Sequence, residues 1–336
     1  MASPAKRVLV TGGAGFIGSH FVRHLLAQTD ASITILDALT YAGSLSTIHD
    51  VIGDRVSFVR GRIEDAALVD RLVSQHELVV NFAAESHNDN SISDPRLFVE
   101  TNVSGTFAIL EAVRKHGVRL HHISTDEVFG DLDFDDPNKF SESRAYNPSS
   151  PYSATKAASD FLVRAWAHTY GIHATISNCS NNYGPYQHVE KFIPRQITNI
   201  LSGVRPRLYG TGENIRDWIH VEDHSSAVLR IIESGRLGQT YLIGADGERS
   251  NREVIQDILR LMNKPEDEFD LVNDRPGHDR RYAIDASLLR DELGWRPVFT
   301  DFTVGLESTI DWYRNNEQWW AEQKLATEAF YAKTGH

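Results

Sequence analysis

A hydroxyl and two adjacent carboxyl groups end an apolar run in residues 121–130, HHISTDEVFG. Thr125, Asp126 and Glu127 stand where a buried strand would finish, and ligands of open α/β sheets bind at that end of the strands. Side chains of this kind can carry out acid–base chemistry on a polar substrate. Adjacent carboxylates are nevertheless more often a solvated loop, so this segment alone does not establish a catalytic site.

A tyrosine and a lysine four residues apart strengthen the case for chemistry. Tyr152 and Lys156, in YSATK, share one face of a helix predicted over residues 152–170. An ammonium fixed beside a phenol favours the phenolate, so we expect a lowered pKa for Tyr152. That phenolate would be a base that works near neutral pH, and the site then needs only a hydride acceptor.

The amino-terminal segment predicts where that acceptor binds. Residues 7–11 have the pattern of a short buried strand, and Gly12, Gly15 and Gly18 lead into a helix predicted over residues 16–28. Glycines at this turn let the backbone approach a pyrophosphate, which the N-terminus of the helix attracts. The alternative is a tight turn that serves only helix–strand packing.

An acidic residue indicates which dinucleotide is bound. Asp37 ends a strand predicted over residues 32–37, at about the distance from Gly18 expected for a carboxylate that binds a ribose diol. The same carboxylate would repel a 2′-phosphate, which favours NAD over NADP. The alternative is that Asp37 caps a turn or a helix.

The order of the remaining elements predicts the fold class. Strands predicted at residues 56–60, 78–82 and 119–124 alternate with helices at residues 66–75 and 95–115. This alternation is typical of an α/β protein with a doubly wound parallel sheet, the Rossmann arrangement.

Beyond residue 180 the pattern loosens into short strands and helices, which indicates a smaller C-terminal α/β lobe. We expect residues 1–180 to form an NAD-binding Rossmann domain, rejoined by about residues 217–245, and residues 181–336 to form mainly the second lobe. The polar connection over residues 131–150 is expected to be a lid or a binding loop. The late tryptophans are expected to pack in a core rather than to contact a ligand: Trp312, Trp319 and Trp320.

The net charge of −12, from 34 basic and 46 acidic residues, argues against general nucleic-acid binding and against binding to an anionic membrane. The sequence shows neither a signal peptide nor a membrane span. Its single cysteine, Cys179, excludes an internal disulfide and favours a reducing compartment. We therefore expect a cytoplasmic protein.

No metal is expected. His20 with His24, and His220 with His224, have a spacing that can bind zinc, but no third ligand is apparent near either pair. Cys179 lacks an evident activating group and is expected to be a buried thiol.

Seven motifs, in the order in which they stand here, resemble those of the extended short-chain dehydrogenase/reductases, and in particular of the dTDP-glucose 4,6-dehydratase family. They are TGGAGFIGS, AAESHNDNS, STDEVFGD, SPYSATKAASD, NCSNNYGPYQ, RDWIHVEDH and DRPGHDRRYAID. The resemblance covers about residues 6–313. The glycine motif and the Tyr–Lys pair mark only the wider superfamily, whereas TDE and the last motif are specific to the dehydratase branch.

The resemblance implies a chemistry that suits these residues. Tyr152, held by Lys156, takes the proton of the 4-hydroxyl of a hexose while C4 gives hydride to NAD. Glu127 then removes the C5 proton and Asp126 protonates the departing C6 hydroxyl, after which the hydride returns to C6. Thr125 would hydrogen-bond O4. Because one ionised carboxylate raises the pKa of its neighbour, Asp126 is expected to remain available as an acid.

The resemblance also implies the binding residues. The expected cofactor contacts are Gly12, Gly15, Phe16, Ile17, Gly18, Asp37, Ala38, Leu39, Thr40, Arg62, Ile63, Ala83, Ala84, Ser86, Thr101, Tyr152, Lys156 and Asn181. The expected contacts of a nucleotide sugar, held mainly by the second lobe, are Ser86, Thr125, Asn182, Lys191, Phe192, Tyr209, Arg216, Asn251, Arg275 and His278. A homodimer through the helices at residues 95–115 and 152–170 is implied as well.

Two residues depart from the family pattern. Arg62 replaces an acid that normally accepts a hydrogen bond from the adenine amino group, which a guanidinium cannot do. Phe129 replaces a tyrosine and loses a ring hydroxyl. The sequence also leaves alternatives open: UDP-glucose as the substrate, a sugar-nucleotide 4-epimerase, or an NAD-binding protein without catalytic activity. The epimerase needs no Asp–Glu pair, so Asp126 and Glu127 favour the dehydratase.

Overall fold

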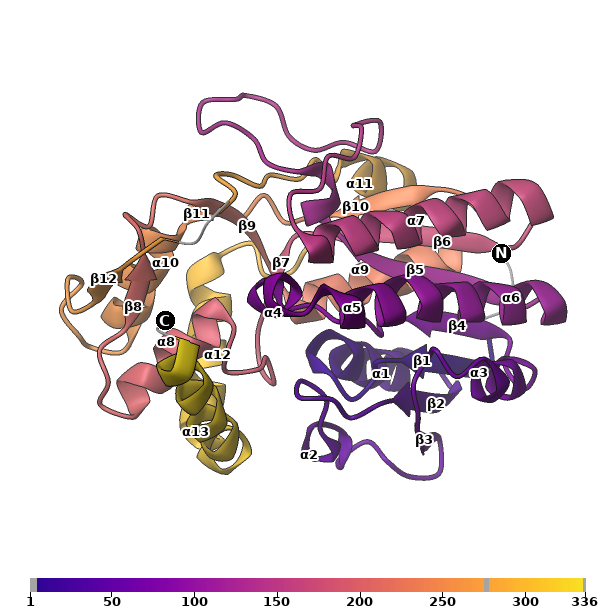
Figure 1. Ribbon diagram of the computed structural model, residues 1–336, viewed down its shortest axis with the longest axis horizontal. Helices are drawn as coiled ribbons and strands as arrows, with labels where there is room; N and C mark the ends of the chain where they lie inside the picture. Colours follow the sequence, from indigo (N-terminus) through magenta and orange to yellow (C-terminus); the bar gives the residue numbers. More distant parts are fainter. Residues whose placement is uncertain (1–4, 275–277, 335–336) are drawn as a thin grey trace.

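The computed structural model describes residues 5–274 and 278–334, with side chains up to residue 329. Figure 1 shows a larger lobe built on one sheet and a smaller lobe beside it that contains most of the C-terminal third of the chain. Arg275 lies outside the described residues. None of the helices in these two ranges has an apolar stretch long enough to cross a bilayer.

The larger lobe is organised around a parallel sheet of seven strands in the order β10-β6-β5-β4-β1-β2-β3. The predicted doubly wound parallel sheet is therefore confirmed. Its strands are β1 (Arg7–Thr11), β2 (Ser32–Asp37), β3 (Val56–Arg60), β4 (Leu78–Asn81), β5 (Arg119–Thr125), β6 (Ala174–Cys179) and β10 (Thr240–Ile243). The central strands β4 and β6 are buried along their whole length because helices cover both faces of the sheet.

Two helical layers enclose this sheet. One face packs on α1 (Phe16–Gln28), α9 (Val221–Ser234) and α11 (Ser287–Leu293) through a core that includes Phe21 and Ile231. The other face packs on α3 (Ala66–Val73), α6 (Thr106–His116) and α7 (Pro151–Tyr170) through a core that includes Leu110 and Val163. Alternate residues of each strand serve the two cores, as the period of two in a strand requires. Two short helices, α2 (Leu45–Ile48) and α4 (Asn88–Ser93), lie in the connections.

The single helix predicted over residues 95–115 is interrupted. The structure has α5 (Pro95–Phe98), then a π-helix η1 (Val99–Gly105), then α6. In the π-helix, the Asn102 side chain accepts a hydrogen bond from the Glu85 amide and donates one to the Glu85 carbonyl, at 2.9 and 3.1 Å. The wider turn thus ties this helix to the segment after β4, a long-range contact that helix periodicity does not encode.

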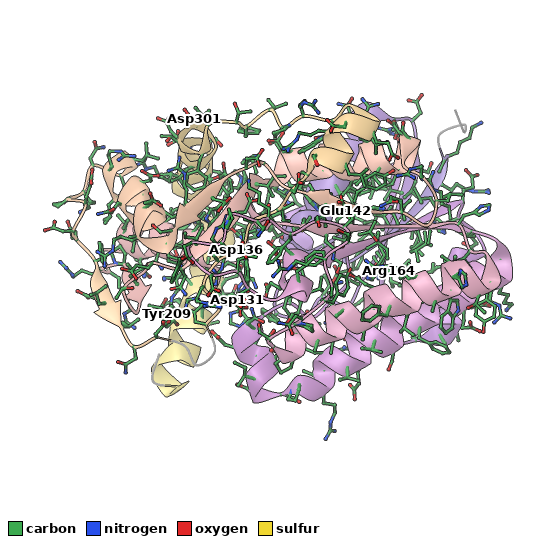
Figure 2. The ribbon with its side chains drawn as sticks, turned by 90° about the horizontal axis from the view of Figure 1, so that it is seen from above. Asp131, Asp136, Glu142, Arg164, Tyr209 and Asp301 are labelled. Carbon is green, nitrogen blue, oxygen red and sulfur yellow. The ribbon has the colours of Figure 1, made fainter. Side chains whose placement is uncertain are left out.

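The smaller lobe has its own core. Its strands are β7 (Asn181–Tyr183), β8 (Arg207–Tyr209), β9 (Ile215–His220), β11 (Glu248–Ser250) and β12 (Asp270–Val272), which form a three-stranded sheet β11-β9-β7 and a two-stranded sheet β12-β8. Its helices are α8 (Phe192–Leu201), α10 (Asn251–Leu261), α12 (Phe302–Asn315) and α13 (Glu317–Thr334). Trp312, Trp319 and Trp320 belong to or pack against this core, as expected. Seen from above in Figure 2, Tyr209 lies on the smaller lobe and Arg164, on α7, lies on the larger one.

The polar connection after β5 is anchored to the protein. Leu132 and Phe140 are buried, and their amides donate hydrogen bonds to the carbonyls of Arg281 and Ala283. In Figure 2, Asp131 and Asp136 of this connection lie between the labelled residues of the two lobes. The segment therefore joins the lobes instead of standing free as a lid.

The N-terminus of α7, which carries Tyr152 and Lys156, is fixed by a capping box. Ser150 Oγ accepts a hydrogen bond from the Ser153 amide at 3.1 Å, Ser153 Oγ accepts one from the Ser150 amide at 3.0 Å, and Pro151 occupies the first turn. The same Ser150 hydroxyl donates to Asn88 Oδ1 at 3.0 Å.

We predict that Ser150→Ala lowers the free energy of unfolding by about 1 kcal/mol, because it leaves the first turn of α7 with an unpaired amide. Urea unfolding followed by circular dichroism measures this loss. Ser143→Ala, an exposed serine in the same connection, is the control and should leave the midpoint unchanged. Equal midpoints for the two variants would contradict the role given to the cap.

Candidate active site

The strand order reverses between β1 and β4, and this switch point forms the first half of the site. β2 and β3 extend the sheet on one side of β1, whereas β4, β5 and β6 extend it on the other. Parallel sheets bind ligands in the crevice at the carboxyl ends of such neighbouring strands. The glycines after β1 and the small residues after β4 meet there, so chain topology alone brings these two motifs together.

The glycines leave room where the backbone segments approach each other. Gly12 has φ +68°, and a Cβ on it would lie 2.6 Å from the amide nitrogen of Ala83. A Cβ on Gly18 would lie 2.3 Å from the carbonyl oxygen of Gly12. The N-terminus of α1 opens onto this turn with no side-chain cap, so its amides remain available to an anion. The cradle thus has the shape and the polarity that a pyrophosphate requires.

Asp37, at the end of β2, both caps a turn and lines the cavity, the two roles considered for it from the sequence. Its carboxylate accepts hydrogen bonds from the amides of Ala14 and Leu39, at 2.9 and 2.8 Å, and it also lines the cavity. Burial raises the pKa of Asp37, and the two amides oppose that shift. Leu39 has a positive φ of 52°. It was predicted to contact the cofactor, but it is not among the residues that line this cavity.

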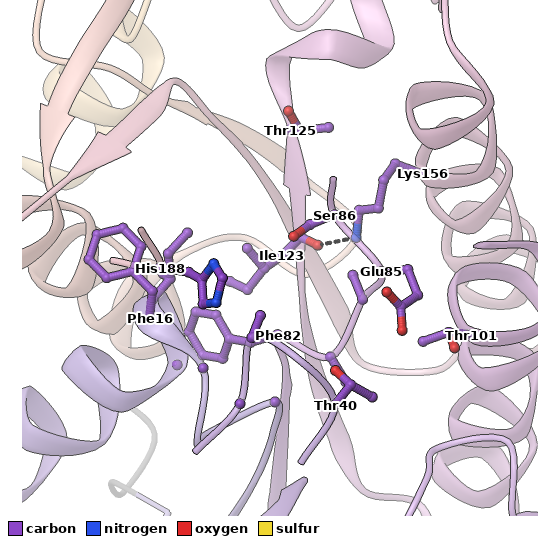
Figure 3. Close-up of a pocket in the computed structure, with 18 of the residues that line it drawn as sticks. Phe16, Thr40, Phe82, Glu85, Ser86, Thr101, Ile123, Thr125, Lys156 and His188 are labelled. Atoms are coloured by element: carbon purple, nitrogen blue, oxygen red, sulfur yellow. Dashed lines mark hydrogen bonds between the residues drawn. The ribbon is translucent and has the colours of Figure 1, made fainter. Parts of the chain in front are cut away.

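One cavity collects every other residue predicted to touch the cofactor, and Figure 3 shows part of its wall. These residues are Gly12, Gly15, Phe16, Ile17, Gly18, Asp37, Ala38, Thr40, Arg62, Ile63, Ala83, Ala84, Ser86, Thr101, Tyr152, Lys156 and Asn181. The wall also includes residues that the sequence analysis missed, notably Glu64, Glu85, His188 and Glu190. The residue types present, a glycine cradle and a carboxylate at the end of β2, fit a dinucleotide.

Arg62 has a carboxylate partner in this cavity. Its Nη1 lies 3.6 Å from Glu64 Oε1, and the Thr101 hydroxyl donates to the same oxygen at 2.6 Å. The residue that replaces the family's acid is therefore paired with another acid two positions later. Glu64 lies four residues beyond the end of β3, in the loop at the carboxyl end of the sheet, and that position was the available signal for it in the sequence.

A single turn of 3₁₀-helix, η2 (Asp126–Phe129), places the two adjacent carboxyl groups at the end of β5. Thr125 caps this turn: its hydroxyl accepts a hydrogen bond from the Glu127 amide and donates one to Asp126 Oδ1, both at 3.3 Å. Glu127 Oε2 accepts a hydrogen bond from Asn88 Nδ2 at 2.9 Å. Both carboxyl groups line the cavity near Tyr152 and Lys156.

The environments of the two carboxyl groups differ in a way that assigns their protons. Burial, and then the charges of Glu127 and Asp217, raise the pKa of Asp126 well above its usual range. Burial also raises the pKa of Glu127, but the hydrogen bond from Asn88 and the charges of Arg216 and Lys191 oppose that shift. Glu127 is therefore the first of the pair to ionise, and the raised pKa expected for Asp126 is found, with burial as its main cause and the Glu127 charge second.

The expected lowering of the Tyr152 pKa is wrong for this structure. Burial raises the pKa of Tyr152 well above its usual range, and Glu127, Cys179 and Asp126 raise it further. The Lys156 ammonium instead donates to the Ile123 carbonyl at 2.7 Å, the bond drawn in Figure 3. Helical spacing placed the two side chains in one cavity, but it did not anticipate the cost of a phenolate in a buried site beside two carboxyl groups.

A second cavity adjoins the first and carries most of the predicted substrate contacts. Ser86, Lys191, Phe192, Tyr209, Arg216, Asn251 and His278 line it. Thr125 and Asn182 line the first cavity instead. The two cavities share five wall residues: Ser86, Glu127, Asn181, Glu190 and Lys191. Asn88, Arg195, Arg207, Asp279 and Tyr282 also line the second cavity and were missed by the sequence analysis.

Arg216 is held rigidly at the edge of the second cavity. Its guanidinium lies 4.2 Å from the centre of the Tyr282 ring and donates to the carbonyls of Ile215 and Asp279. Lys191 Nζ donates to the Ser86 carbonyl at 3.0 Å. These two cations supply the positive charge that an anionic ligand needs in a protein with a negative net charge.

The remaining candidates lie in packed surroundings. His20 Nε2 lies 2.9 Å from the Pro185 carbonyl, and residues 5–274 and 278–334 contain no group of three side chains suited to hold a metal ion. Burial raises the pKa of Cys179 to about 12, so its thiol is a poor nucleophile. Phe129 is buried against Phe140 and Tyr146 and lines neither cavity.

Comparisons with known proteins show the family to which the chain is related. A family model described as GDP-mannose 4,6 dehydratase matches residues 9–309. A dTDP-glucose 4,6-dehydratase of Mycobacterium tuberculosis is 63% identical over 330 residues, which cover 98% of this chain and 99% of the relative.

Solved structures of a dehydratase and of an epimerase match the chain over most of its length. The crystal structure of DesIV, a dTDP-glucose 4,6-dehydratase from Streptomyces venezuelae with NAD and TYD bound, matches with a TM-score of 0.91 and 45% identity over 94% of this chain and 99% of that chain. A UDP-glucose 4-epimerase of Thermus thermophilus, in complex with NAD, matches with a TM-score of 0.84 and 29% identity over 92% of this chain and 99% of that chain.

The doubly wound sheet, the glycine cradle and the Tyr152–Lys156 pair define an extended short-chain dehydrogenase/reductase. Within the class, the chain belongs to the dTDP-glucose 4,6-dehydratase family.

The raised pKa of Asp126 has a consequence for stability. A carboxyl whose pKa is higher in the folded state stabilises the fold below its unfolded pKa, and this contribution is lost as the pH rises through the folded pKa. We predict that Asp126→Asn increases the free energy of unfolding relative to the native chain. The increase should grow as the pH rises above 3.8, the ordinary value, and level off above the folded pKa. Its size is about 1.4 kcal/mol for each unit by which the pKa is raised.

Urea unfolding at several pH values measures the difference, and Asp131→Asn is the control of opposite sign. The Arg280 guanidinium lowers the pKa of Asp131, so its replacement should reduce stability above the ordinary carboxyl pKa. If the free energies of unfolding of the native chain and of Asp126→Asn differ by the same amount at every pH, the assignment of the proton to Asp126 is contradicted.

Proposed function

We propose that this protein dehydrates dTDP-glucose to dTDP-4-keto-6-deoxy-glucose with tightly bound NAD as an internal hydride carrier. The observation that carries the proposal is the Asp126–Glu127 pair in the same cavity as Tyr152 and Lys156. When bound, NAD supplies the acceptor for the hydride of C4 and afterwards the donor to C6. Oxidation at C4, loss of water across C5 and C6 and reduction at C6 then balance without an external oxidant.

Tyr152 is the base that takes the proton of the 4-hydroxyl. In the cavity as described, burial and the neighbouring carboxyl groups oppose its ionisation. The oxidised nicotinamide is a cation, and together with the Lys156 ammonium it would favour the phenolate. The base is therefore expected to become effective only when the cofactor is in place.

Glu127 and Asp126 carry out the elimination. Once C4 is a ketone, the C5 proton is acidic and the ionised Glu127 removes it. Asp126, which keeps its proton because of its burial, gives that proton to the C6 hydroxyl as water leaves. Each acid–base group is typically worth about two to four decades in rate.

The division of labour between the lobes is part of the proposal. The larger lobe would hold NAD, and the second cavity, which the smaller lobe mainly builds, would hold the nucleotide and the sugar. Lys191 and Arg216 are suited to bind the diphosphate. The high identity to a dTDP-glucose 4,6-dehydratase supports thymidine as the base over uridine.

A sugar-nucleotide 4-epimerase is the second candidate, supported by the similarity to the Thermus thermophilus enzyme. An epimerase needs the hydride carrier and the tyrosine, but it has no proton to remove from C5. The buried acid beside an ionised carboxylate would then have no function, although burying it is costly. The pair therefore favours dehydration.

We predict that dTDP-glucose carrying deuterium at C4 yields product with the label in its new methyl group, as mass spectrometry would show.

In Glu127→Gln, oxidation at C4 should proceed while elimination stops, so NADH absorbance should accumulate. Tyr152→Phe should abolish even that absorbance. A hexose epimer without loss of water would favour the second candidate, and unlabelled product would refute internal hydride return.

We also propose a homodimer through α5, η1, α6 and α7. These helices pack side by side and carry exposed apolar side chains: Leu97, Val99, Phe107, Phe161 and Tyr170. Large exposed apolar side chains on neighbouring helices are typical of an interface. Cytoplasmic location is proposed as well, on the basis of the single free thiol of Cys179.

We predict that Phe161→Glu converts the dimer to a monomer, because it places a charge in the centre of that apolar face. Light scattering after size-exclusion chromatography measures the mass. Val298→Glu, at an exposed valine in the loop before α12, is the control and should leave the dimer intact. A native chain that elutes as a monomer would refute the proposed interface.

A further inference from the structure

A row of polar side chains crosses the sheet beneath the site and is used by none of the steps above. Thr11, Asn81 and His122 are register partners on β1, β4 and β5, and their exposed fractions are 0, 1 and 1%. Thr11 Oγ1 donates to Asn81 Oδ1 at 2.5 Å, and Asn81 Nδ2 lies 3.1 Å from His122 Nδ1. His122 Nε2 in turn lies 3.5 Å from Oδ1 of Asp160, on α7.

The direction of this row fixes the proton on His122. The Ala83 amide donates to Thr11 Oγ1, so the Thr11 hydroxyl directs its own proton to Asn81 Oδ1. The Asn81 amide group must then donate to His122 Nδ1. A neutral imidazole that accepts at Nδ1 carries its proton on Nε2, which faces Asp160. His122 Nε2 and Asp160 Oδ1 have no other hydrogen-bond partner among the described residues, so these two buried atoms serve each other.

The other oxygen of Asp160 is surrounded by donors. Asp160 Oδ2 accepts hydrogen bonds from Ser124 Oγ and Tyr146 OH, both at 2.9 Å, and from Asn178 Nδ2 at 3.1 Å. Donors from three segments and the His122 proton all point at one fully buried side chain. Burial raises the pKa of Asp160, and the Lys156 ammonium and these three donors oppose that shift, so the arrangement favours the carboxylate over what burial alone would give.

The charge that this carboxylate faces is Lys156, one helical turn earlier on α7. Burial lowers the pKa of the Lys156 ammonium, and Asp160 is the first of the groups that raise it. The groups around Lys156 that can carry charge are Asp160 and Tyr152 on its own helix, Cys179 on β6 and His122 on β5. Burial favours the neutral form of the last three, so Asp160 is left as the counter-ion.

We propose that Asp160 is a positioning residue that keeps Lys156 charged, and that the row Thr11–Asn81–His122 holds Asp160 ionised and oriented for this purpose. The inference rests on the proposed function, because it concerns the lysine that supports the Tyr152 base. Asp160 lines neither cavity, so it acts through Lys156 and not on a ligand. The row extends from the segment that borders the cofactor cavity at Ala83 to the helix that carries the base.

The decisive experiment is the pH profile of kcat and KM for dTDP-glucose in Asp160→Asn, a variant of equal size without the charge. The pKa of Lys156 should fall, so the alkaline limb of kcat should move to lower pH by roughly one to three units. At a pH above the alkaline limbs of both proteins, kcat of the variant would then be about ten- to a thousandfold lower than that of the native chain, and it would recover as the pH is lowered. KM should stay unchanged, and Asp160→Glu should restore much of the alkaline limb.

Two neighbouring histidines provide a matched pair for a second test. His121 is as buried as His122, but it points to the opposite face of β5 and contacts Thr175 and Ser177. His122→Leu should lose most of its kcat with KM unchanged, whereas His121→Leu should keep its kcat. Both variants should lose comparable stability in urea. This pair decides the question if Asp160→Asn does not fold.

Two results would overturn the inference and leave the row as a purely structural element. One is an alkaline limb of kcat that lies at the same pH in Asp160→Asn and in the native chain; the other is an equal kcat in the two histidine variants. The native chain separates this failure from failure of the proposed function. If native protein with bound NAD does not convert dTDP-glucose, the function is wrong; if it converts the sugar and the variant limb does not move, only the role of Asp160 is wrong.

Discussion

The cost of placing charge out of water is the constraint on which the rest of this site depends. Asp126, Tyr152 and Lys156 are buried and Glu127 is partly buried, and burial is the largest influence on the pKa of each. In such surroundings small differences in hydrogen bonding decide which group is charged. Asn88 and two cations favour the ionised form of Glu127, whereas Arg216 and Thr125 oppose the rise of the Asp126 pKa but are outweighed by burial and by the charges of Glu127 and Asp217. Two adjacent carboxyl groups can therefore perform opposite tasks.

The fold accounts for how these groups come together. The reversal of strand order at β1 and β4 opens a crevice for a dinucleotide, β5 delivers the hydroxyl and the carboxyl groups, and α7 brings the phenol and the ammonium from the adjacent layer. The smaller lobe adds the cations at the opposite wall. Each contribution comes from the end of a regular element, where the backbone is held by the sheet or by a cap, so the groups are positioned before any ligand arrives.

Much of this could be predicted from the sequence, and for identifiable reasons. The sheet strands and α7 follow from apolar runs bounded by glycines, and the cofactor wall follows from local motifs, since these signals lie within a few residues of one another. The π-helix around Asn102 could not be predicted, because it depends on Glu85, which is distant in the chain. The Tyr152 pKa was predicted with the wrong sign, because it depends on burial and on charged groups of η2 and β6 that only tertiary structure brings to it. Glu64 and Asn88 were missed for the same reason: their partners are set by tertiary structure.

The five residues shared by the two cavities, among them Glu190 and Lys191, form a common wall. A substitution in this wall changes both cavities at once. Under the proposed function, a change that reshapes the cavity for the sugar would also alter how tightly the dinucleotide is held. Substrate range is then expected to diversify through positions away from this wall, such as Tyr209 and Asn251, which border only the second cavity. The shared wall would thus be the slowly evolving part of the protein and the far side of the smaller lobe its adaptable part.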